Sequence, residues 1–187
     1  MIFAFSTSSP IASVAIFTEE GVLLFSGDRP SEMKASEVCL SLVAESGFDP
    51  KQGTIFLADI GPGSFTGTRV GVTIAKTFAF VAGGKCAGAN AFDLISPTAT
   101  VVLPSKKGEW FIREVGSIAI RDTSLPTEEF VGFGPGIPEQ THPLAKRFVA
   151  LIPSLSLISP EEFVPAYLME PSISIQKKNL GLAGAPK

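Results

Sequence analysis

The chain has 187 residues, of which 45% are hydrophobic and 18% are charged, and its formal net charge is −3. This composition excludes a disordered chain, and the length suits one large domain or two small ones. A net acidic chain is a poor candidate for binding nucleic acid unaided, because phosphate contacts need clustered cations. The single histidine, His142, excludes a His-rich metal centre and any catalysis that needs two histidines.

The two cysteines, Cys39 and Cys86, both fall in apolar segments. Such positions are typical of reduced core residues in a cytosolic protein rather than of a disulfide framework. No run of 18 apolar residues is present, and no Lys or Arg precedes Arg29, so neither a membrane span nor a secretory signal is expected. We therefore expect a cytoplasmic protein without a membrane partner.

The first part of the chain predicts three strands and then a helix. Short turns separate the apolar runs at 2–5, 12–17 and 22–26, which predicts an antiparallel meander. Apolar residues at three- and four-residue spacing then predict a helix over 37–46 that ends at Gly47.

A buried strand, a glycine-rich loop and a second helix are predicted next. The continuous apolar run at 54–58 is typical of a strand covered on both faces. The loop spans 61–67, and the helix over 68–81 ends before Gly83 and Gly84. This order of elements is typical of half of a ribonuclease H-like or actin-like ATPase fold, an α/β fold with a mixed sheet whose first three strands are antiparallel.

A smaller, trimmed α/β second domain is expected after residue 97, so that the domains span 1–97 and 98–187. Its predicted elements are a helical turn at 92–95, a strand at 100–103, a hairpin arm at 109–120 and a short helix at 144–151. The polar stretch from Ser172 onward is expected to fray.

The densest motif is the loop Gly61-Pro62-Gly63-Ser64-Phe65-Thr66-Gly67. A loop between a strand and a helix directs backbone N–H groups and the helix dipole at an anion. The motif lacks the Lys of a P-loop, and Thr66 stands where a dinucleotide-binding loop needs its third glycine. Two interpretations stay open: a cradle for a phosphate, and a tight turn that lets the helix pack closely.

A hydroxyl cluster, Ser6-Thr7-Ser8-Ser9, follows the first strand. In actin-like ATPases this hairpin wraps phosphate, and an acidic residue at the end of the first strand orients the metal. Here that place is Ser6, whose hydroxyl cannot supply the charge that orients Mg²⁺, so a simple polar turn is favoured. The candidate nucleotide-binding residues are Ser6, Thr7, Ser8, Gly61, Gly63, Ser64 and Thr66.

Small residues form a stripe along the second helix. Gly67, Gly71, Ala75, Ala79 and Gly83 recur every four residues and share one face. Such a stripe lets another backbone approach, either the sheet of the same chain or a helix of a partner. We expect both contacts, because much of the remaining helix surface is apolar as well.

The stretch from Asp59 to Phe80 resembles the TsaB family, also called YeaZ, which assists threonylcarbamoyladenosine synthesis on tRNA. The loop Gly-Pro-Gly-Ser-Phe-Thr-Gly and the small-residue helix follow the family pattern nearly throughout. Weaker likeness covers 2–16, the hairpin at 105–110 and the proline-tyrosine-leucine segment at 164–169. Two departures are Ser6, where the family has Asp, and Lys34-Ala35-Ser36, where it has His-Ser.

The resemblance implies a non-catalytic subunit with a degenerate actin-like ATPase fold. Its partner would be TsaD, the catalytic paralogue, with TsaE, a small ATPase, as a further partner and tRNA contacted only through the complex. The helices 37–46 and 68–81 would dock on TsaD or on a second copy of the chain. The predicted partner-binding residues are Val38, Leu42, Arg69, Gly71, Val72, Ala75, Lys76, Phe78 and Ala79.

Three functions follow for testing. The first is a scaffold that holds a TsaD-like enzyme active, with no catalytic residue, metal or intrinsic cofactor of its own. The second is an ATP-binding phosphoryl or carbamoyl transferase that uses the loop 61–67, against which the missing acid at Ser6 argues. The third is a peptidase, which the sequence disfavours because it contains neither a zinc motif nor a catalytic triad.

Overall fold

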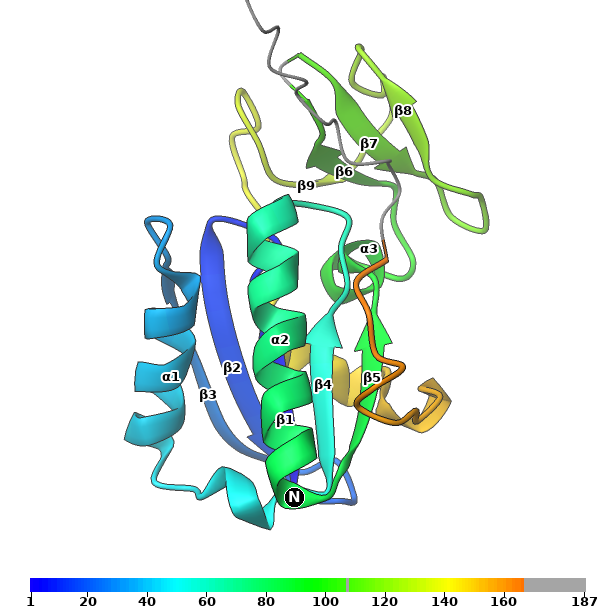
Figure 1. Cartoon of the computed structure of the whole chain (residues 1–187). Coiled ribbons are helices and arrows are strands. Elements are labelled where there is room, and N and C mark those ends of the chain that lie inside the picture. Colours follow the sequence, from blue (N-terminus) through cyan, green and yellow to red (C-terminus); the bar gives the residue numbers. More distant parts are fainter. Residues whose placement is uncertain (107, 167–187) are drawn as a thin grey trace, which may run out of the picture.

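A five-stranded mixed sheet forms the larger part of the protein in a computed structural model that describes residues 1–106 and 108–166 (Figure 1). Its strands are β1 (Ile2–Ser6), β2 (Ile11–Phe17), β3 (Leu23–Pro30), β4 (Ile55–Asp59) and β5 (Lys85–Ala89). They lie in the order β3-β2-β1-β4-β5. β1, β2 and β3 pair antiparallel, whereas β4 joins β1 and β5 joins β4 in parallel. This is the predicted antiparallel meander with a helical crossover.

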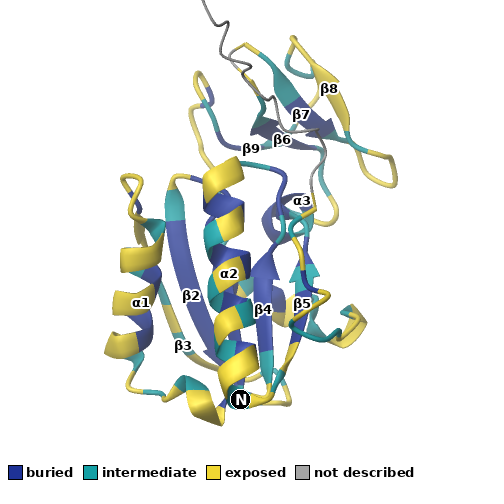
Figure 2. Cartoon of the chain, viewed as in Figure 1, coloured by how far each residue is buried: buried dark blue, intermediate teal, exposed yellow. Residues whose placement is uncertain are grey.

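Two helices cover one face of this sheet, α1 (Ala35–Ser46) and α2 (Phe65–Ala82). Between them and the strands lies a fully buried aromatic core that includes Phe3, Phe5 and Phe56. Phe3 and Phe56 stack with ring centroids 5.6 Å apart. Figure 2 shows that both helices bury the side toward the sheet and expose the opposite side.

The ends of the helices follow from local chemistry. α2 begins at Phe65, three residues earlier than predicted, because the Ser64 hydroxyl accepts a hydrogen bond from the Gly67 N–H at 3.1 Å. α1 and α2 end at Gly47 and Gly83, whose φ angles of 73° and 70° lie in the left-handed region that glycine tolerates best. Both of these ends are at the predicted glycines.

The second part of the chain forms a four-stranded sheet of β6 (Val101–Pro104), β7 (Trp110–Arg113), β8 (Ile120–Asp122) and β9 (Val131–Gly132). The strand order is β8-β7-β6-β9. The predicted hairpin arm at 109–120 is therefore wrong as a single strand. A turn closed by the Ser117 N–H and the Glu114 carbonyl divides it into two strands.

Helical segments connect the two sheets. The short helix α3 (Ala91–Ile95) confirms the turn predicted at 92–95, and the helix predicted at 144–151 is the 3₁₀ segment η2 (Ala145–Ala150), followed by η3 (Ile152–Ser154). Another 3₁₀ turn, η1 (Pro50–Gln52), precedes β4. Strands β5 and β9 were not predicted.

The chain returns from the second sheet to the first. The Ala145 N–H donates to the Ser13 hydroxyl at 2.8 Å, and Ile158 pairs with Cys86 on β5. The predicted boundary at residue 97 falls between α3 and β6 and stays a prediction. The expected fraying from Ser172 lies outside the described residues, as do Lys107 and the family-like residues 167–169. Within the described ranges, no helix combines the length and apolar character needed to cross a bilayer.

Candidate functional site

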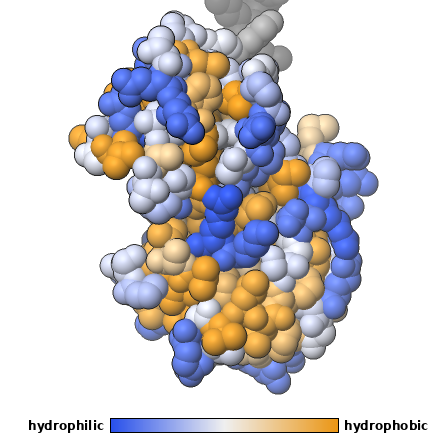
Figure 3. All heavy atoms as spheres, turned by 180° about the vertical axis from the view of Figure 1, so that it is seen from behind, coloured by the Kyte–Doolittle hydropathy of each residue, from blue (hydrophilic) through white to orange (hydrophobic). Residues whose placement is uncertain are grey.

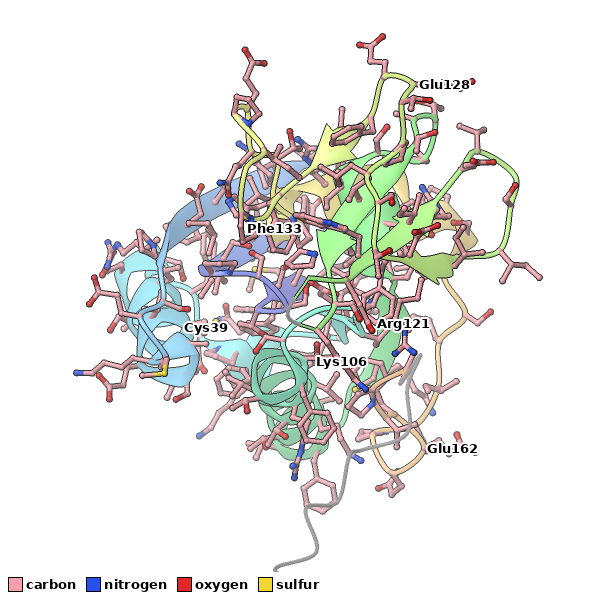
Figure 4. The ribbon with its side chains drawn as sticks, turned by 90° about the horizontal axis from the view of Figure 1, so that it is seen from above. Cys39, Lys106, Arg121, Glu128, Phe133 and Glu162 are labelled. Carbon is pink, nitrogen blue, oxygen red and sulfur yellow. The ribbon has the colours of Figure 1, made fainter. Side chains whose placement is uncertain are left out.

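A cleft of about 1130 Å³ lies between the two sheets. Its lower wall comes from the β1–β2 turn, the loop 61–67 and the beginnings of α1 and α2. Its upper wall comes from the second sheet and includes Phe111 and Phe133. Phe133 is buried near the centre of the molecule seen from above (Figure 4). Clefts at such a junction of layers are the usual place for a ligand.

The β1–β2 turn packs directly on the loop 61–67. The Ser64 N–H donates to the Ser8 carbonyl at 2.7 Å, and the Thr7 hydroxyl donates to the Gly67 carbonyl at 2.7 Å. A Cβ at Gly67 would lie 2.0 Å from the Thr7 carbonyl oxygen, and one at Gly63 would lie 2.3 Å from that of Ser8. The glycines therefore permit a close approach of backbone to backbone, as the tight-turn interpretation predicts.

A buried carboxylate, which the sequence analysis did not identify, accepts hydrogen bonds from the same turn. Asp59, at the end of β4, is 0% exposed and accepts hydrogen bonds from the Ser6 hydroxyl at 2.8 Å, from the Ser8 hydroxyl and from the Gly61 N–H at 2.9 Å. Burial raises the pKa of this carboxyl above its ordinary value, although these hydrogen bonds oppose the rise. The sequence did offer a signal for this cluster, since Asp59 directly follows a buried apolar strand and acidic residues are rarely buried unless they have a partner.

The predicted nucleotide-binding residues are mostly brought together. Thr7, Ser8, Gly61, Gly63, Ser64 and Thr66 all line the cleft. Ser6 lies outside the lining and is fully buried between the Asp59 carboxylate and the Pro143 carbonyl, with 3.0 Å to the latter. Its hydroxyl is thus already engaged within the protein.

The charge of the cleft does not suit a nucleotide phosphate. Among the described residues that line it, Glu32 is the only one with an ionisable side chain. A triphosphate would have to bind to hydroxyl and backbone groups alone, with no Lys or Arg to offset its charge. No group of three or more His, Cys, Asp or Glu in residues 1–106 and 108–166 is placed to hold a metal ion.

His142, left open by the sequence, sits beside the upper wall. Its ring centroid lies 4.7 Å from that of Phe133, and burial lowers the pKa of the imidazole. Its Nδ1 is buried and has no hydrogen-bond partner among the described residues. His142 is therefore a partly buried aromatic neighbour of Phe133.

The small-residue stripe of α2 faces the chain's own sheet. Gly71, Val72, Ala75 and Ala79 are buried, and so is Leu42 on α1. A Cβ at Gly71 would lie 2.5 Å from the Thr7 hydroxyl oxygen, so the space at this position is already filled from within, whereas Gly83 at the end of the stripe is exposed. These five predicted partner residues are therefore buried in the isolated chain, and their contact with a partner stays a prediction.

The other four predicted partner residues lie nearer the surface. Arg69 is exposed and stacks over the Phe65 ring, with 5.4 Å to its centroid, and Lys76 is half-buried. Val38 is half-buried against the core, and Phe78 packs with its ring centroid 6.0 Å from that of Phe5. The outward side of the two helices instead presents large apolar residues that the prediction omitted. They are Leu40 (50% exposed), Phe80 (72%) and Val81 (61%), whereas the exposed Phe65 (46%) lines the cleft.

The meander, the parallel crossover and the cleft between two sheets define an actin-like ATPase fold of the ribonuclease H-like type. Two solved structures share it. One is a crystal structure of an uncharacterized protein with similarity to the peptidase YeaZ from Pseudomonas aeruginosa, with a TM-score of 0.73 and 18% identity, covering 90% of this chain and 99% of that one. The other is YeaZ from Pseudomonas aeruginosa, with a TM-score of 0.69 and 18% identity, covering 89% and 99%.

A family model described as TsaD, tRNA N6-adenosine threonylcarbamoyltransferase, matches residues 28–104. No match was found among curated protein sequences. Residues 28–104 are thus similar to the TsaD family, and the two YeaZ structures share the fold of this chain, in line with the resemblance that the motif at 59–80 indicates.

Proposed function

We propose that this chain is a non-catalytic subunit of the machinery that makes N6-threonylcarbamoyladenosine in tRNA, and that it docks on a catalytic TsaD-like subunit. The observation that carries the proposal is the TsaD family match over residues 28–104. That range contains α1 and α2, whose outward sides expose the large apolar residues described above. The family match supports the pathway, and the chemistry of the cleft supports the division of labour between the two subunits.

The chemistry of the cleft favours a helper over an enzyme. Among the described residues that line the cleft, only Glu32 is ionisable, and it supplies no cation for a phosphate or an adenylate. Asp59, the carboxylate nearest the loop, is enclosed by hydrogen bonds from Ser6, Ser8 and Gly61 and does not line the cleft. The transfer of threonylcarbamoyl from an adenylate to the adenosine of tRNA would therefore take place on the partner.

The outward side of α1 and α2 is the proposed docking surface. We define it by Leu40 on α1 and by Arg69, Phe80 and Val81 on α2, all of which are exposed. Burying a side chain of this size on association contributes roughly 1.5–3 kcal/mol, and exposed aromatic residues are the usual anchors of interfaces. A helical surface on the TsaD-like partner would cover it by ridges-into-grooves packing.

Further partners would reach the chain through the same complex. A second copy of the chain would occupy the docking surface when the TsaD-like subunit is absent, since Leu40, Phe80 and Val81 are apolar side chains exposed to water. A TsaE-like ATPase and the tRNA would bind the assembled complex rather than the isolated chain, whose net charge of −3 does not favour nucleic acid.

The experiment measures complex formation with a TsaD-like partner by size-exclusion chromatography with light scattering. The variants are Leu40→Asp and Phe80→Asp, which put a charge into the docking surface. The matched control is Leu24→Asp on β3, where the leucine is 42% exposed, against 50% for Leu40. Figure 3 shows that apolar atoms also gather on the lower rear face, opposite the helices, which makes a control away from α1 and α2 necessary.

The account predicts a stable complex for the unchanged chain and for Leu24→Asp, and its loss for Leu40→Asp and Phe80→Asp. Each helix variant should weaken binding by about 2 kcal/mol or more, which is roughly thirtyfold in Kd. Loss of the complex in Leu24→Asp alone would move the interface to the rear face and refute the proposed surface.

A further inference from the structure

We propose that His142 makes the connection between the two sheets sensitive to pH: protonation of its imidazole loosens the segment 141–145 and lets the cleft open. The inference goes beyond the proposed function and needs no partner protein. It rests on the place of His142 in the fold and on the buried ring nitrogen that has no hydrogen-bond partner among the described residues.

The segment 141–145 runs from the second sheet to the first (Figure 1). On one side of His142, the Thr141 N–H donates to a carbonyl of β9 at 2.7 Å. On the other side, the Pro143 carbonyl accepts from the Ser6 hydroxyl on β1 at 3.0 Å. The Ala145 N–H then donates to a hydroxyl of β2 at 2.8 Å. A displacement of His142 therefore acts on the hydrogen bonds that hold the two cleft walls together.

The environment of the His142 ring disfavours a second proton. The Nδ1 atom is buried without a partner in the part of the chain that the structure describes, and the ring packs against that of Phe133. A neutral imidazole keeps one nitrogen free of hydrogen, whereas both nitrogens of an imidazolium are donors. Protonation therefore buries an unpaired charged N–H, and a displacement that brings Nδ1 into water removes this cost.

No neighbouring carboxylate offsets the cost within residues 1–106 and 108–166. Burial alone lowers the pKa of His142, and none of the ion pairs there includes its ring. Glu139 and Lys146, on either side along the chain, are exposed, and Arg147 donates to a carbonyl of α3. Asp59, on the first sheet, accepts hydrogen bonds from the β1–β2 turn. The protonated ring thus gains no partner in the closed form.

The direction of the pH effect follows from the lowered pKa. In an open or unfolded chain, the imidazole has its ordinary pKa of about 6.5. Because the pKa is lower in the closed form, the contribution of His142 to stability is complete above the ordinary value and is lost as the pH falls through the folded-state pKa. Asp59, whose pKa is raised, has the opposite dependence, so the sign distinguishes the two groups.

The first experiment measures amide hydrogen exchange by NMR at about one pH unit above and below the ordinary histidine pKa. Protection factors at Thr141 and Ala145 should fall by at least about threefold at the lower pH, out of the roughly tenfold that one unit allows, while the amides of β1 and β4 keep theirs. His142→Phe, which keeps a ring against Phe133 but takes up no proton, should abolish the decrease. Glu139→Gln, at an exposed acid of the same loop, should retain it.

A second experiment follows the unchanged chain, so that it gives a result even where His142→Phe does not fold. His142 is the single histidine, and its ring signals therefore report its titration without ambiguity. Its pKa should lie below the ordinary value. The amide signal of Gly132 should shift with the same midpoint, because its carbonyl accepts from the neighbouring Thr141.

A third experiment measures the opening itself. Cys39 and Cys86 are both 0% exposed, so spin labels attach selectively to Thr73→Cys on α2 and Ser124→Cys beyond β8, both at exposed positions. The distance between the two labels should lengthen at the lower pH, and it should stay constant when His142→Phe is added. An unchanged distance would overturn the proposal. An imidazole that titrates at or above its ordinary pKa, or an equal loss of protection in His142→Phe, would overturn it as well.

Discussion

Replacing Gly67 with alanine should disrupt the contact between the β1–β2 turn and the loop 61–67. The added Cβ would lie 2.0 Å from the Thr7 carbonyl oxygen, about 1.4 Å short of ordinary contact at 3.4 Å. The obstructing atom belongs to the backbone, so no side-chain rotation relieves the clash. The β1–β2 turn would have to move away from α2. The tight-turn interpretation of the loop therefore predicts a large decrease in the free energy of unfolding.

The cost has three parts. Forced overpacking costs roughly 1–3 kcal/mol. Lengthening the Thr7–Gly67 and Ser64–Ser8 hydrogen bonds, both 2.7 Å, costs about 0.5–1.5 kcal/mol each. The higher helix propensity of alanine returns about 1 kcal/mol. The free energy of unfolding should therefore fall by about 3 kcal/mol.

Urea unfolding followed by far-UV circular dichroism measures this loss. Thr66→Ala is the matched control, because Thr66 is the exposed neighbour in the same turn of α2 and its change should stay within about 0.5 kcal/mol. An alanine at position 67 that left the protein as stable as before, or about 1 kcal/mol more stable, would refute the reasoning. The loop glycines would then be free for another role, such as binding an anion.

Three further outcomes are expected. Burial raises the folded-state pKa of Asp59 above 3.8, so the contribution of this carboxyl to stability is present at low pH and is lost as the pH rises through the folded-state pKa. In urea titrations, the difference in free energy of unfolding between the unchanged protein and Asp59→Asn should therefore fall as the pH rises. An increase of this difference with pH would contradict the prediction. Arg113 binds Asp93 and, at 2.6 Å, the Ser96 carbonyl, so Arg113→Met should lower the free energy of unfolding by about 1–2 kcal/mol, measured by Trp110 fluorescence; an unchanged urea midpoint would count against it. Millimolar ATP with Mg²⁺ should produce no binding heat in calorimetry, whereas a saturable signal would revive the nucleotide-binding alternative.

The elements with strong periodicity were predictable from the sequence. The apolar runs of β1, β2 and β4 and the glycines after α1 and α2 each have a local cause, and local causes are visible in a single sequence. β5 was missed because Lys-Cys-Ala-Gly-Ala has no β-branched residue and is a strand only through its pairing with β4. The Asp59 cluster joins residues that are about 50 positions apart, which only the folded sheet brings together.

The helix stripe shows where pattern alone is ambiguous. Small residues at i, i+4 positions indicate that a backbone approaches, but they do not identify which backbone. In this chain the β1–β2 turn occupies the space at Gly71, and the exposed residues Leu40 and Phe80 mark the opposite side of the helix pair. The sequence could predict a close contact, whereas its partner depended on the tertiary structure.

Reconstituted tRNA modification tests the proposed function most directly. Threonylcarbamoyladenosine is measured in tRNA after incubation with a threonylcarbamoyl-adenylate donor, a TsaE-like ATPase and a TsaD-like subunit, with or without this chain. The account predicts that this chain alone forms no product, that its addition strongly increases the product formed by the TsaD-like subunit, and that Phe80→Asp abolishes the increase. Full modification without this chain, or an unchanged increase with Phe80→Asp, would contradict the account.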